Sequence, residues 1–381
     1  MKHSKETLLV SIFVWVLALV VGLPALAQPF AYVANFNDNS VSVIKTASNT
    51  VVATVHVGMG PVAVAITPNG AFAYVANFND NTVSVINTAS NMVVATVPVG
   101  MGPTAVAITP NGAFAYIADQ NSNDVSVIDT DTNTLTTTVL VGMSPSAVAI
   151  TPNGAFVYVT NFTDGLTAGS VSVIDIDTAI NTVVATVTVG IGPLGVAIAP
   201  NGAFAYVADS VSNDVSVIDT DSNMLTTTVP VGVSPSASPS AVAITPNGAF
   251  AYVTNFTEGS VSVIDTAINR RSDPALASGS DSRGPSVVAT VTVGIGLGPL
   301  GVAITPDGDS AYVANSVSDS ISVIDTETNT VPTTVLLALG SGPMGVAITP
   351  PAASCHEDDH EKGNGGRDGR SHSCKRSGKE D

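Results

Sequence analysis

The sequence predicts an all-β protein folded as a seven-bladed β-propeller of four-stranded antiparallel blades. Three observations predict it: a composition of strand and turn residues, seven copies of one repeat, and chain ends that complement each other. The chain of 381 residues holds 33 glycines and 23 prolines, and only 11% of its residues are charged. Valine and threonine favour strands, whereas glycine, proline, asparagine and aspartate favour turns. The composition therefore already indicates β structure.

Residues 1–27 differ from the rest of the chain and predict a secretory signal peptide. Lys2 and Lys5 form a basic start, residues 8–21 supply an apolar stretch, and Ala25-Leu26-Ala27 has the small-x-small form of a cleavage site. We expect cleavage near Ala27, and hence a secreted, periplasmic or cell-surface protein. An uncleaved membrane anchor is the alternative, because residues 8–23 approach the length of a membrane span.

Residues 28–350 consist of seven copies of one repeat, and this self-similarity determines the predicted fold. A motif of the form Ala/Val-Tyr-Val/Ile-x-Asn/Asp occurs once in each copy. The first four copies are evenly spaced, at roughly the length of a four-stranded propeller blade. The later copies lie farther apart because of insertions, all of which we expect between strands. The seven tyrosines are Tyr32, Tyr74, Tyr116, Tyr158, Tyr206, Tyr252 and Tyr312.

Each copy contains four short strand signals, which the second full unit illustrates. Its first signal is a continuous apolar run, typical of a strand buried on both faces. The pair Asn69-Gly70 then predicts a tight hairpin. Four antiparallel strands in about 40 residues match a propeller blade. The four signals are residues 62–66, 72–76, 83–86 and 93–97.

The two ends of the repeat array predict that the ring closes. The array starts at a second strand, residues 30–34, and finishes with an orphan first strand, residues 345–348. Pairing the two completes the seventh blade and removes the exposed edges that an open array would carry. An open β-solenoid or a string of separate small sheets is the alternative.

The sequence of the repeat is similar to that of a known family. Tyr158-Val159-Thr160-Asn161 and Tyr252-Val253-Thr254-Asn255 are followed by segments such as Ser-Val-Ser-Val-Ile-Asp and Val-Ala-Ile-Thr-Pro-Asn-Gly. Over about residues 30–350 the chain resembles the YVTN β-propeller repeat family. This resemblance implies a propeller fold and an exported or surface protein of a bacterium or archaeon. The family supplies no set of catalytic residues to transfer.

The charge of the chain excludes some classes of partner. The formal net charge is −18, which repels nucleic acid and anionic lipid. We therefore expect no nucleic-acid partner and no membrane insertion after signal cleavage. Lys45 apart, the basic residues of the propeller lie in one inserted loop and are Arg270, Arg271 and Arg283. We interpret that loop as solvated, with docking of an acidic partner as the alternative.

The polar residues that recur in every copy have a structural interpretation. We interpret the motif tyrosine as a packing residue with its hydroxyl bonded near the rim. The Asn or Asp that ends the motif, as at Asn35, is predicted to bond its own backbone at a turn. The aspartate after Val-Ile, as at Asp129, is predicted to be a turn residue. Lys45 and Asn87 replace it in two copies, which argues against a required metal ligand.

Catalysis would need residues that break the repeat, and few do. His56 is the one histidine of the propeller, both cysteines lie in the tail, and no Gly-x-Ser-x-Gly elbow occurs. We therefore assign no catalytic residue, predict no cofactor, and expect a monomeric, non-catalytic scaffold that binds a protein or carbohydrate partner of the cell envelope. The alternative is a lactonase-like hydrolase or lyase with an axial cation site. Under that alternative the cofactor would be a divalent cation.

The predicted topology also selects a face for binding. Loops after the second and the fourth strand of each unit emerge on the same face, where propeller ligands usually bind. Two of these loops are enlarged, and one carries an irregular acidic residue. The candidates are therefore Asp164, Thr167, Ser234, Ser236, Ser238 and Glu258.

Residues 351–381 form a charged tail that contains glycine, serine and histidine and lacks apolar residues for a core. We expect it to be disordered. A disulfide between Cys355 and Cys374 is a second interpretation for an exported protein. A metal site is a third, because thiol and imidazole ligands are gathered there. Its weak candidates are Cys355, His356, His360, His372 and Cys374.

Overall fold

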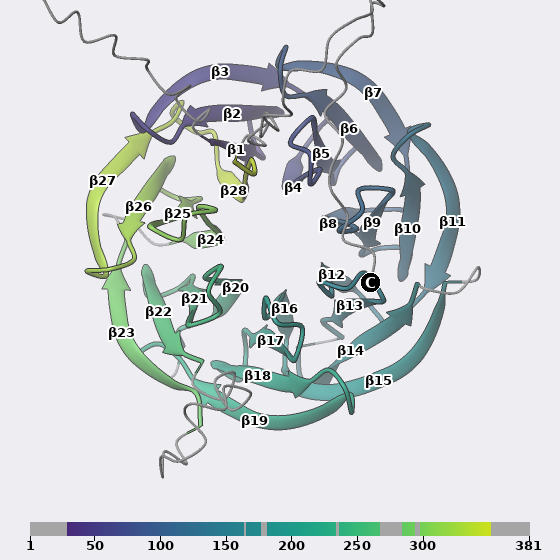
Figure 1. Ribbon diagram of the computed structural model, residues 1–381, viewed down its shortest axis with the longest axis vertical. Helices are drawn as coiled ribbons and strands as arrows, with labels where there is room; N and C mark the ends of the chain where they lie inside the picture. Colours follow the sequence, from purple (N-terminus) through teal and green to yellow (C-terminus); the bar gives the residue numbers. More distant parts are fainter. Residues whose placement is uncertain are drawn as a thin grey trace, which may run out of the picture.

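The computed structural model describes residues 29–163, 165–176, 181–233, 236–266, 284–293 and 298–351. Within them, 28 strands form seven four-stranded sheets arranged as a ring around one axis (Figure 1). The predicted seven-bladed propeller is confirmed. The predicted signal peptide, the three arginines of the inserted loop and residues 352–381 of the tail lie outside the described residues. No helix in the described part of the chain has the length and apolar character needed to cross a membrane.

Each blade has four strands, here called A to D from the axis outward (Figure 1). The A strands are β28 (Pro343–Ile348), β4 (Pro61–Ile66), β8 (Pro103–Ile108), β12 (Pro145–Ile150), β16 (Pro193–Ile198), β20 (Pro239–Ile244) and β24 (Pro299–Ile304). The B strands are β1 (Phe30–Asn35), β5 (Phe72–Asn77), β9 (Phe114–Asp119), β13 (Phe156–Asn161), β17 (Phe204–Asp209), β21 (Phe250–Asn255) and β25 (Ser310–Asn315).

The C strands are β2 (Ser40–Lys45), β6 (Thr82–Asn87), β10 (Asp124–Asp129), β14 (Ala168–Asp175), β18 (Asp214–Asp219), β22 (Ser260–Asp265) and β26 (Ser320–Asp325). The D strands, at the outer edge, are β3 (Thr50–His56), β7 (Met92–Pro98), β11 (Thr134–Leu140), β15 (Thr182–Ile191), β19 (Met224–Pro230), β23 (Ser286–Thr292) and β27 (Thr330–Leu336). Blade 1 contains β28 and β1 to β3, and blades 2 to 7 follow in chain order.

The core lies between neighbouring blades rather than within any one of them. In β5, every residue after Phe72 is buried, because both faces of this middle strand are covered by adjacent blades. The outer strand β7 instead alternates, with Val97 buried and Val94 54% exposed. Tyr74 of blade 2 belongs to the same apolar cluster as Ile117 of blade 3. Each blade therefore needs a neighbour on both sides to bury its apolar surface.

The repeated tyrosine links one blade to the next. The Tyr74 hydroxyl donates a hydrogen bond to Oδ1 of Asn133 at 2.7 Å, in the C–D turn of the following blade. Asn133 has a φ of 55°, a conformation that asparagine tolerates better than most residues. Burial raises the pKa of Tyr74 to about 12. The predicted packing role with a bonded hydroxyl is confirmed.

Pairing between the two ends of the array closes the ring. β28 pairs antiparallel with β1, with Ala31 opposite Ile348 and Val33 opposite Val346. In addition, the Phe30 N–H donates to Oγ1 of Thr349 at 2.8 Å. The predicted closure of the first blade by the C-terminal strand is confirmed.

One prediction about the insertions is wrong. The sequence predicts that residues 164–169 are an enlarged loop of blade 4, but β14 begins at Ala168, which pairs with Ile191 of β15. The reason is that the inserted residues continue the β14–β15 ladder instead of leaving the sheet. Among the strands described, β15 of blade 4 is therefore the longest, with 10 residues.

Removing β28 tests the closure. A chain from Gln28 to Gly342 leaves the backbone groups of β1 unpaired at a sheet edge and exposes the apolar sides of blades 7 and 2. We expect it to lose cooperative thermal unfolding and to aggregate, whereas a matched chain from Gln28 to Pro351 unfolds cooperatively. Circular dichroism melts and size-exclusion chromatography measure both. Equal melting temperatures would contradict a closing role for β28.

Candidate functional site

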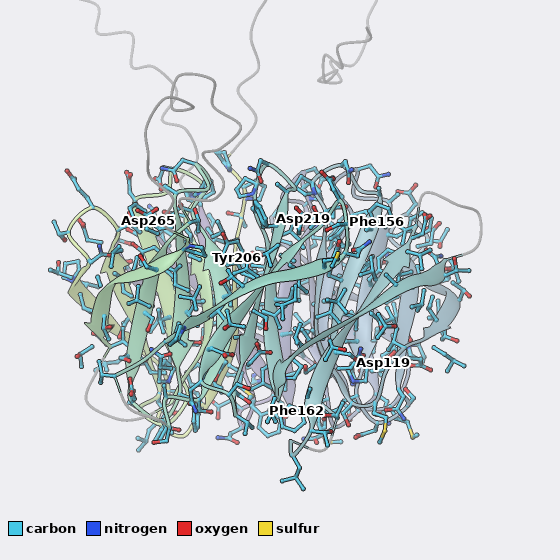
Figure 2. The ribbon with its side chains drawn as sticks, turned by 90° about the horizontal axis from the view of Figure 1, so that it is seen from below. Asp119, Phe156, Phe162, Tyr206, Asp219 and Asp265 are labelled. Carbon is cyan, nitrogen blue, oxygen red and sulfur yellow. The ribbon has the colours of Figure 1, made fainter. Side chains whose placement is uncertain are left out.

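The loops of the propeller gather on two opposite faces. Figure 2 places Phe162, in the B–C loop of blade 4, at the lower edge, and Phe156 and Asp219, beside the A–B and C–D turns, at the upper edge. The B–C and D–A loops therefore share one face, as predicted. We call this the ligand face.

An axial channel of about 440 Å³ opens near this face. Its wall is formed by the second and third residues of the A strands, with two phenylalanines and a glutamine from the B–C loops. A volume of this size is typical of small-molecule sites. The second A-strand residues, in ring order from blade 1, are Met344, Val62, Thr104, Ser146, Leu194, Ser240 and Leu300.

Small residues set how closely the A strands approach each other around the channel. A Cβ atom at Gly195 would lie 2.7 Å from the Cα of Ala241 in the next blade. Likewise, one at Gly345 would lie 2.7 Å from the Val62 carbonyl oxygen. Both contacts are too close for a side chain. The third A-strand position therefore serves packing, and the second position determines the chemistry of the wall.

The channel wall has an apolar side and a side that carries hydroxyl groups. Blades 7, 1 and 2 supply leucine, methionine and valine, which form a continuous apolar arc. Thr104 donates to the Pro145 carbonyl at 3.1 Å, and Ser146 donates to the Pro193 carbonyl at 2.9 Å. Since these hydrogens are used within the protein, the two hydroxyls present acceptor lone pairs to a ligand.

The mouth of the channel is also apolar. Phe36 and Phe78 are half-buried at the start of their B–C loops, and Gln120 occupies the equivalent place in blade 3. Around them the ligand face exposes large apolar side chains from the D–A and B–C loops. These are Met59, Met101, Met143, Leu166, Val211, Val233, Val317 and Leu339.

Glu258 has a structural role in this face. Its two carboxylate oxygens accept from the Val233 N–H at 2.9 and 3.1 Å. Val233 lies in the D–A loop that enters the same blade. The Met59 N–H donates in the same way to Oδ2 of Asp80 at 2.6 Å, and the two acids occupy the same position of the repeat. Glu258 therefore holds the D–A loop in place. Its departure from the repeat is only the replacement of one acidic side chain by another.

The other predicted binding candidates that the structure describes do not line the channel. Thr167 and Ser236 are exposed, and the Ser238 N–H donates to Oδ1 of Asn213 at 2.9 Å. Asp164 and Ser234 lie outside the described residues. Sequence reasoning missed the true wall residues. The available signal was that the second A-strand position varies between copies while its neighbours repeat.

The residue that ends the tyrosine motif does not bond its own backbone, so that prediction is wrong. The Asn77 Nδ2 group donates to Thr82 Oγ1 at 3.1 Å and to Ser84 Oγ at 2.9 Å. Both hydroxyls lie on the adjacent C strand. The reason is that the Asn77 side chain is fully buried, and a buried amide needs hydrogen-bond partners inside the protein, which the two hydroxyls supply. Asp119 and Asp209 occupy this position in blades 3 and 5.

The aspartate after Val-Ile is a turn residue, as predicted. Asp129 Oδ1 accepts from the Thr132 N–H at 2.8 Å and from the Thr132 hydroxyl at 2.9 Å. These hydrogen bonds lower the pKa of the Asp129 carboxyl. Asp219 and Asp325 make the same contacts in their blades. These aspartates lie on the face opposite the channel mouth.

The described channel wall carries no group suited to acid–base or nucleophilic chemistry. Among the described residues that line it there is no carboxylate, imidazole, thiol or amine, and its serines have no adjacent base. Nor do the described residues contain a group of three or more His, Cys, Asp or Glu side chains able to hold a metal. The five tail candidates for a metal lie outside the described residues.

Comparison with known proteins defines the class of this propeller. The sequence matches the family described as lactonase, 7-bladed beta-propeller, over residues 27–143, 133–229 and 182–331. The chain therefore belongs to the lactonase seven-bladed β-propeller family. No curated protein matches it.

Solved structures share the fold. A structure of Kuenenia stuttgartiensis hydrazine synthase is 25% identical, with a TM-score of 0.67, and 81% of this chain and 99% of that one are covered. A functionally unknown protein from Desulfotomaculum acetoxidans is 19% identical, with a TM-score of 0.71 and coverage of 84% and 99%. A Bacteroides uniformis protein named for 6-phosphogluconolactonase is 18% identical, with a TM-score of 0.68 and the same coverage. The last two likenesses concern the fold alone.

The role of Glu258 can be tested by substitution. Glu258→Ala leaves the Val233 N–H without its acceptor, which costs about 1 kcal/mol. We expect faster hydrogen exchange at the Val233 amide and a melting temperature lower by about 2 °C. Glu258→Gln keeps an acceptor and is the matched control. If the alanine variant exchanged no faster at Val233 than the glutamine variant, the loop-fixing role would be wrong.

Proposed function

We propose that this protein is a non-catalytic binding propeller that holds the apolar part of a ligand or partner in the axial channel. The observation that supports the proposal most directly is the composition of the wall. A wall of Leu, Met, Val, Thr and Ser side chains suits binding and supplies no acid, base or nucleophile. The exposed methionines and valines around the mouth extend the apolar surface toward a larger partner.

The charges of the ligand face narrow the ligand class. Lys45 is the one Lys or Arg among the described residues, and it ends β2 on the opposite face. Carboxylates of the B–C loops, such as Asp38 and Asp80, lie around the mouth. An anionic ligand would therefore meet no counter-charge there, whereas a neutral or cationic one would meet no repulsion. Ligand donors would bond to the lone pairs that Thr104 and Ser146 present to the channel.

Family membership favours a second candidate function, lactonase-like hydrolysis with an axial cation. The fold places a channel of suitable size on the face where such propellers bind. The side chains that line this channel do not fit the chemistry, because hydrolysis needs a general base or an activated water. A phosphorylated lactone would in addition require cationic side chains.

The cellular setting remains our proposal from the sequence. The signal-like residues 1–27 and the resemblance to YVTN repeats support export to the periplasm, the cell surface or the medium. In that setting a protein or carbohydrate of the cell envelope is the proposed partner, and the propeller acts as a monomer. Such a partner would place an apolar group in the channel.

Binding in the channel can be tested with Nile red, a neutral apolar dye. Leu300→Arg places a charge in the apolar arc, where desolvation opposes it and the dye loses its contacts. We expect Nile red fluorescence to show dye binding to the wild type and at least roughly tenfold weaker binding to Leu300→Arg. The matched control is Val184→Arg, because Val184 lies on the outer strand of blade 4 and is 52% exposed. Equal loss in both variants would place the dye elsewhere.

The second candidate has its own test. We expect the mature chain to release no acid from δ-gluconolactone or from 6-phosphogluconolactone above the uncatalysed rate, with or without added Ca²⁺ or Mg²⁺. A pH-stat assay measures this. Turnover that Leu300→Arg abolishes and Val184→Arg preserves would establish a lactonase instead of a binding propeller.

A further inference from the structure

Two blades differ from the other five at one cross-strand pair of side chains. In each blade the last residue of the B strand lies opposite the first residue of the C strand, or its equivalent in blade 4. In five blades the pair is an asparagine and a serine or threonine, and the Asn Nδ2 group donates to the hydroxyl at 3.0 to 3.1 Å. These pairs are Asn35 with Ser40, Asn77 with Thr82, Asn161 with Ser170, Asn255 with Ser260 and Asn315 with Ser320.

In blades 3 and 5 both members of the pair are acidic. Asp119 lies opposite Asp124, and Asp209 lies opposite Asp214. Asp119 and Asp209 are fully buried. Where the five other pairs contain an N–H donor and a hydroxyl, two ionised carboxylates contain acceptors only. Both positions change together, so a pair of acids replaces the hydrogen-bonded pair of an asparagine and a hydroxyl residue.

The surroundings leave one oxygen of each buried acid available for a proton. In blade 5, Oδ2 of Asp209 accepts from the Ser216 hydroxyl at 2.6 Å. Oδ1 of Asp209 and Oδ1 of Asp214 are buried and receive no hydrogen bond from an N–H or hydroxyl group of the described residues. Because Asp209 lies directly opposite Asp214 on the neighbouring strand, a proton held between the two carboxyl groups would satisfy these two oxygens. Burial first, and then the neighbouring charge of Asp214, raises the pKa of Asp209.

Blade 3 contains the same cross-strand pair of acids, but its outer acid, Asp124, has a hydroxyl partner that Asp214 of blade 5 lacks. Oδ2 of Asp119 accepts from the Ser126 N–H at 3.1 Å, and its Oδ1 is buried without a partner among the described residues. Burial, together with the charge of Asp124, raises the pKa of Asp119 to about 7. The Ser122 hydroxyl donates to Oδ1 of Asp124 at 2.8 Å.

No basic group faces either pair among the described residues. The strands and loops packed against Asp209 present Gly190, Pro193 and Ser216. Those packed against Asp119 present the equivalent glycine, proline and serine, which are Gly100, Pro103 and Ser126.

In the described part of the chain, the titratable groups that face the two buried acids are their partners, Asp214 and Asp124. A proton is therefore the counter-charge that these sites can hold without any further protein residue.

We propose that each acid pair holds one shared proton in the folded protein, and that the propeller is stabilised by protonation at these two sites. The pairs anchor the B–C loops of the two blades on either side of blade 4. Asp119 also precedes Gln120, which lines the channel. Loss of the protons would leave a buried carboxylate facing a half-buried one in each of these blades and would loosen these loops on the ligand face. The proposal does not depend on the identity of any ligand.

The direction of the pH dependence follows from linkage. Asp119 and Asp209 bind a proton more tightly in the folded than in the unfolded chain, because their folded pKa values are raised from the ordinary value of 3.8. The stabilisation is therefore complete below about pH 4 and is lost as the pH rises to about 7. The turn acids affect stability in a different pH range. Because the pKa of Asp129 is lowered, its stabilising contribution is lost only as the pH falls below the ordinary pKa of a carboxyl group.

The other five blades supply the test variant. Asp119→Asn with Asp124→Ser, together with Asp209→Asn with Asp214→Ser, gives blades 3 and 5 the neutral pair that the chain already uses elsewhere. The matched control removes four exposed acids from turns on the opposite face. It carries Asp131→Asn, Asp221→Asn, Asp309→Asn and Glu327→Gln. Each blade is also changed separately, so that one misfolded variant does not decide the result.

Thermal melts between pH 5 and pH 8 provide the first readout. We expect the melting temperature of the wild type and of the control to fall over this range. That of the neutral-pair variant stays nearly constant and at pH 8 exceeds the wild type by on the order of 5 °C. A neutral-pair variant that falls as steeply as the control would overturn the proposal.

Two further measurements separate a shared proton from a bound cation. An infrared band of a protonated carboxylic acid should be present in the wild type at pH 6 and absent from the neutral-pair variant. Ca²⁺ and Mg²⁺ are added at pH 8. If either ion restored the melting temperature of the wild type but not of the variant, the pairs would be cation sites and the shared proton would be excluded.

Discussion

Each blade of this protein has two apolar faces and can bury them only between two other blades. Middle strands such as β5 are buried on both sides, and the Tyr74 hydroxyl reaches the turn of the following blade. A row of such units has two unsatisfied ends unless it closes. Pairing of β28 with β1 joins the two ends of the repeat array. The position of every other residue around the axis depends on that contact.

Closure also determines where a ligand can bind. When seven A strands meet around one axis, their backbones approach so closely that the third position must be small, as at Gly195 and Gly345. The second position then projects into the remaining space and forms the wall. The binding function that we propose therefore rests on the seven side chains at the second position. They can vary without disturbing the blades.

Most of the fold could be predicted because its signals are local. A regular repeat, Asn-Gly turns and alternating valines define strands and faces without knowledge of the tertiary structure. Contacts across a sheet have no such signal. The partners of Asn77 are hydroxyls on the next strand, and the ladder position that brings them together is seen only in the folded blade. The wall residue Ser146 likewise stands in an ordinary apolar strand sequence, and only comparison of the seven copies shows that its position varies.

A residue that departs from the repeat can be interpreted only when its contacts in the folded protein are known. Glu258 departs alone, and its carboxylate performs the task that Asp80 performs elsewhere. Asp209 departs together with the residue opposite it, so the hydrogen-bonding chemistry of the whole pair changes. The family relationship follows the same logic. It defines the scaffold, whereas lactonase chemistry would have to come from the wall positions, and here those positions carry aliphatic and hydroxyl side chains. The chain therefore keeps the fold of the lactonase propeller family, and the binding function that we propose rests on the described side chains of its axial wall.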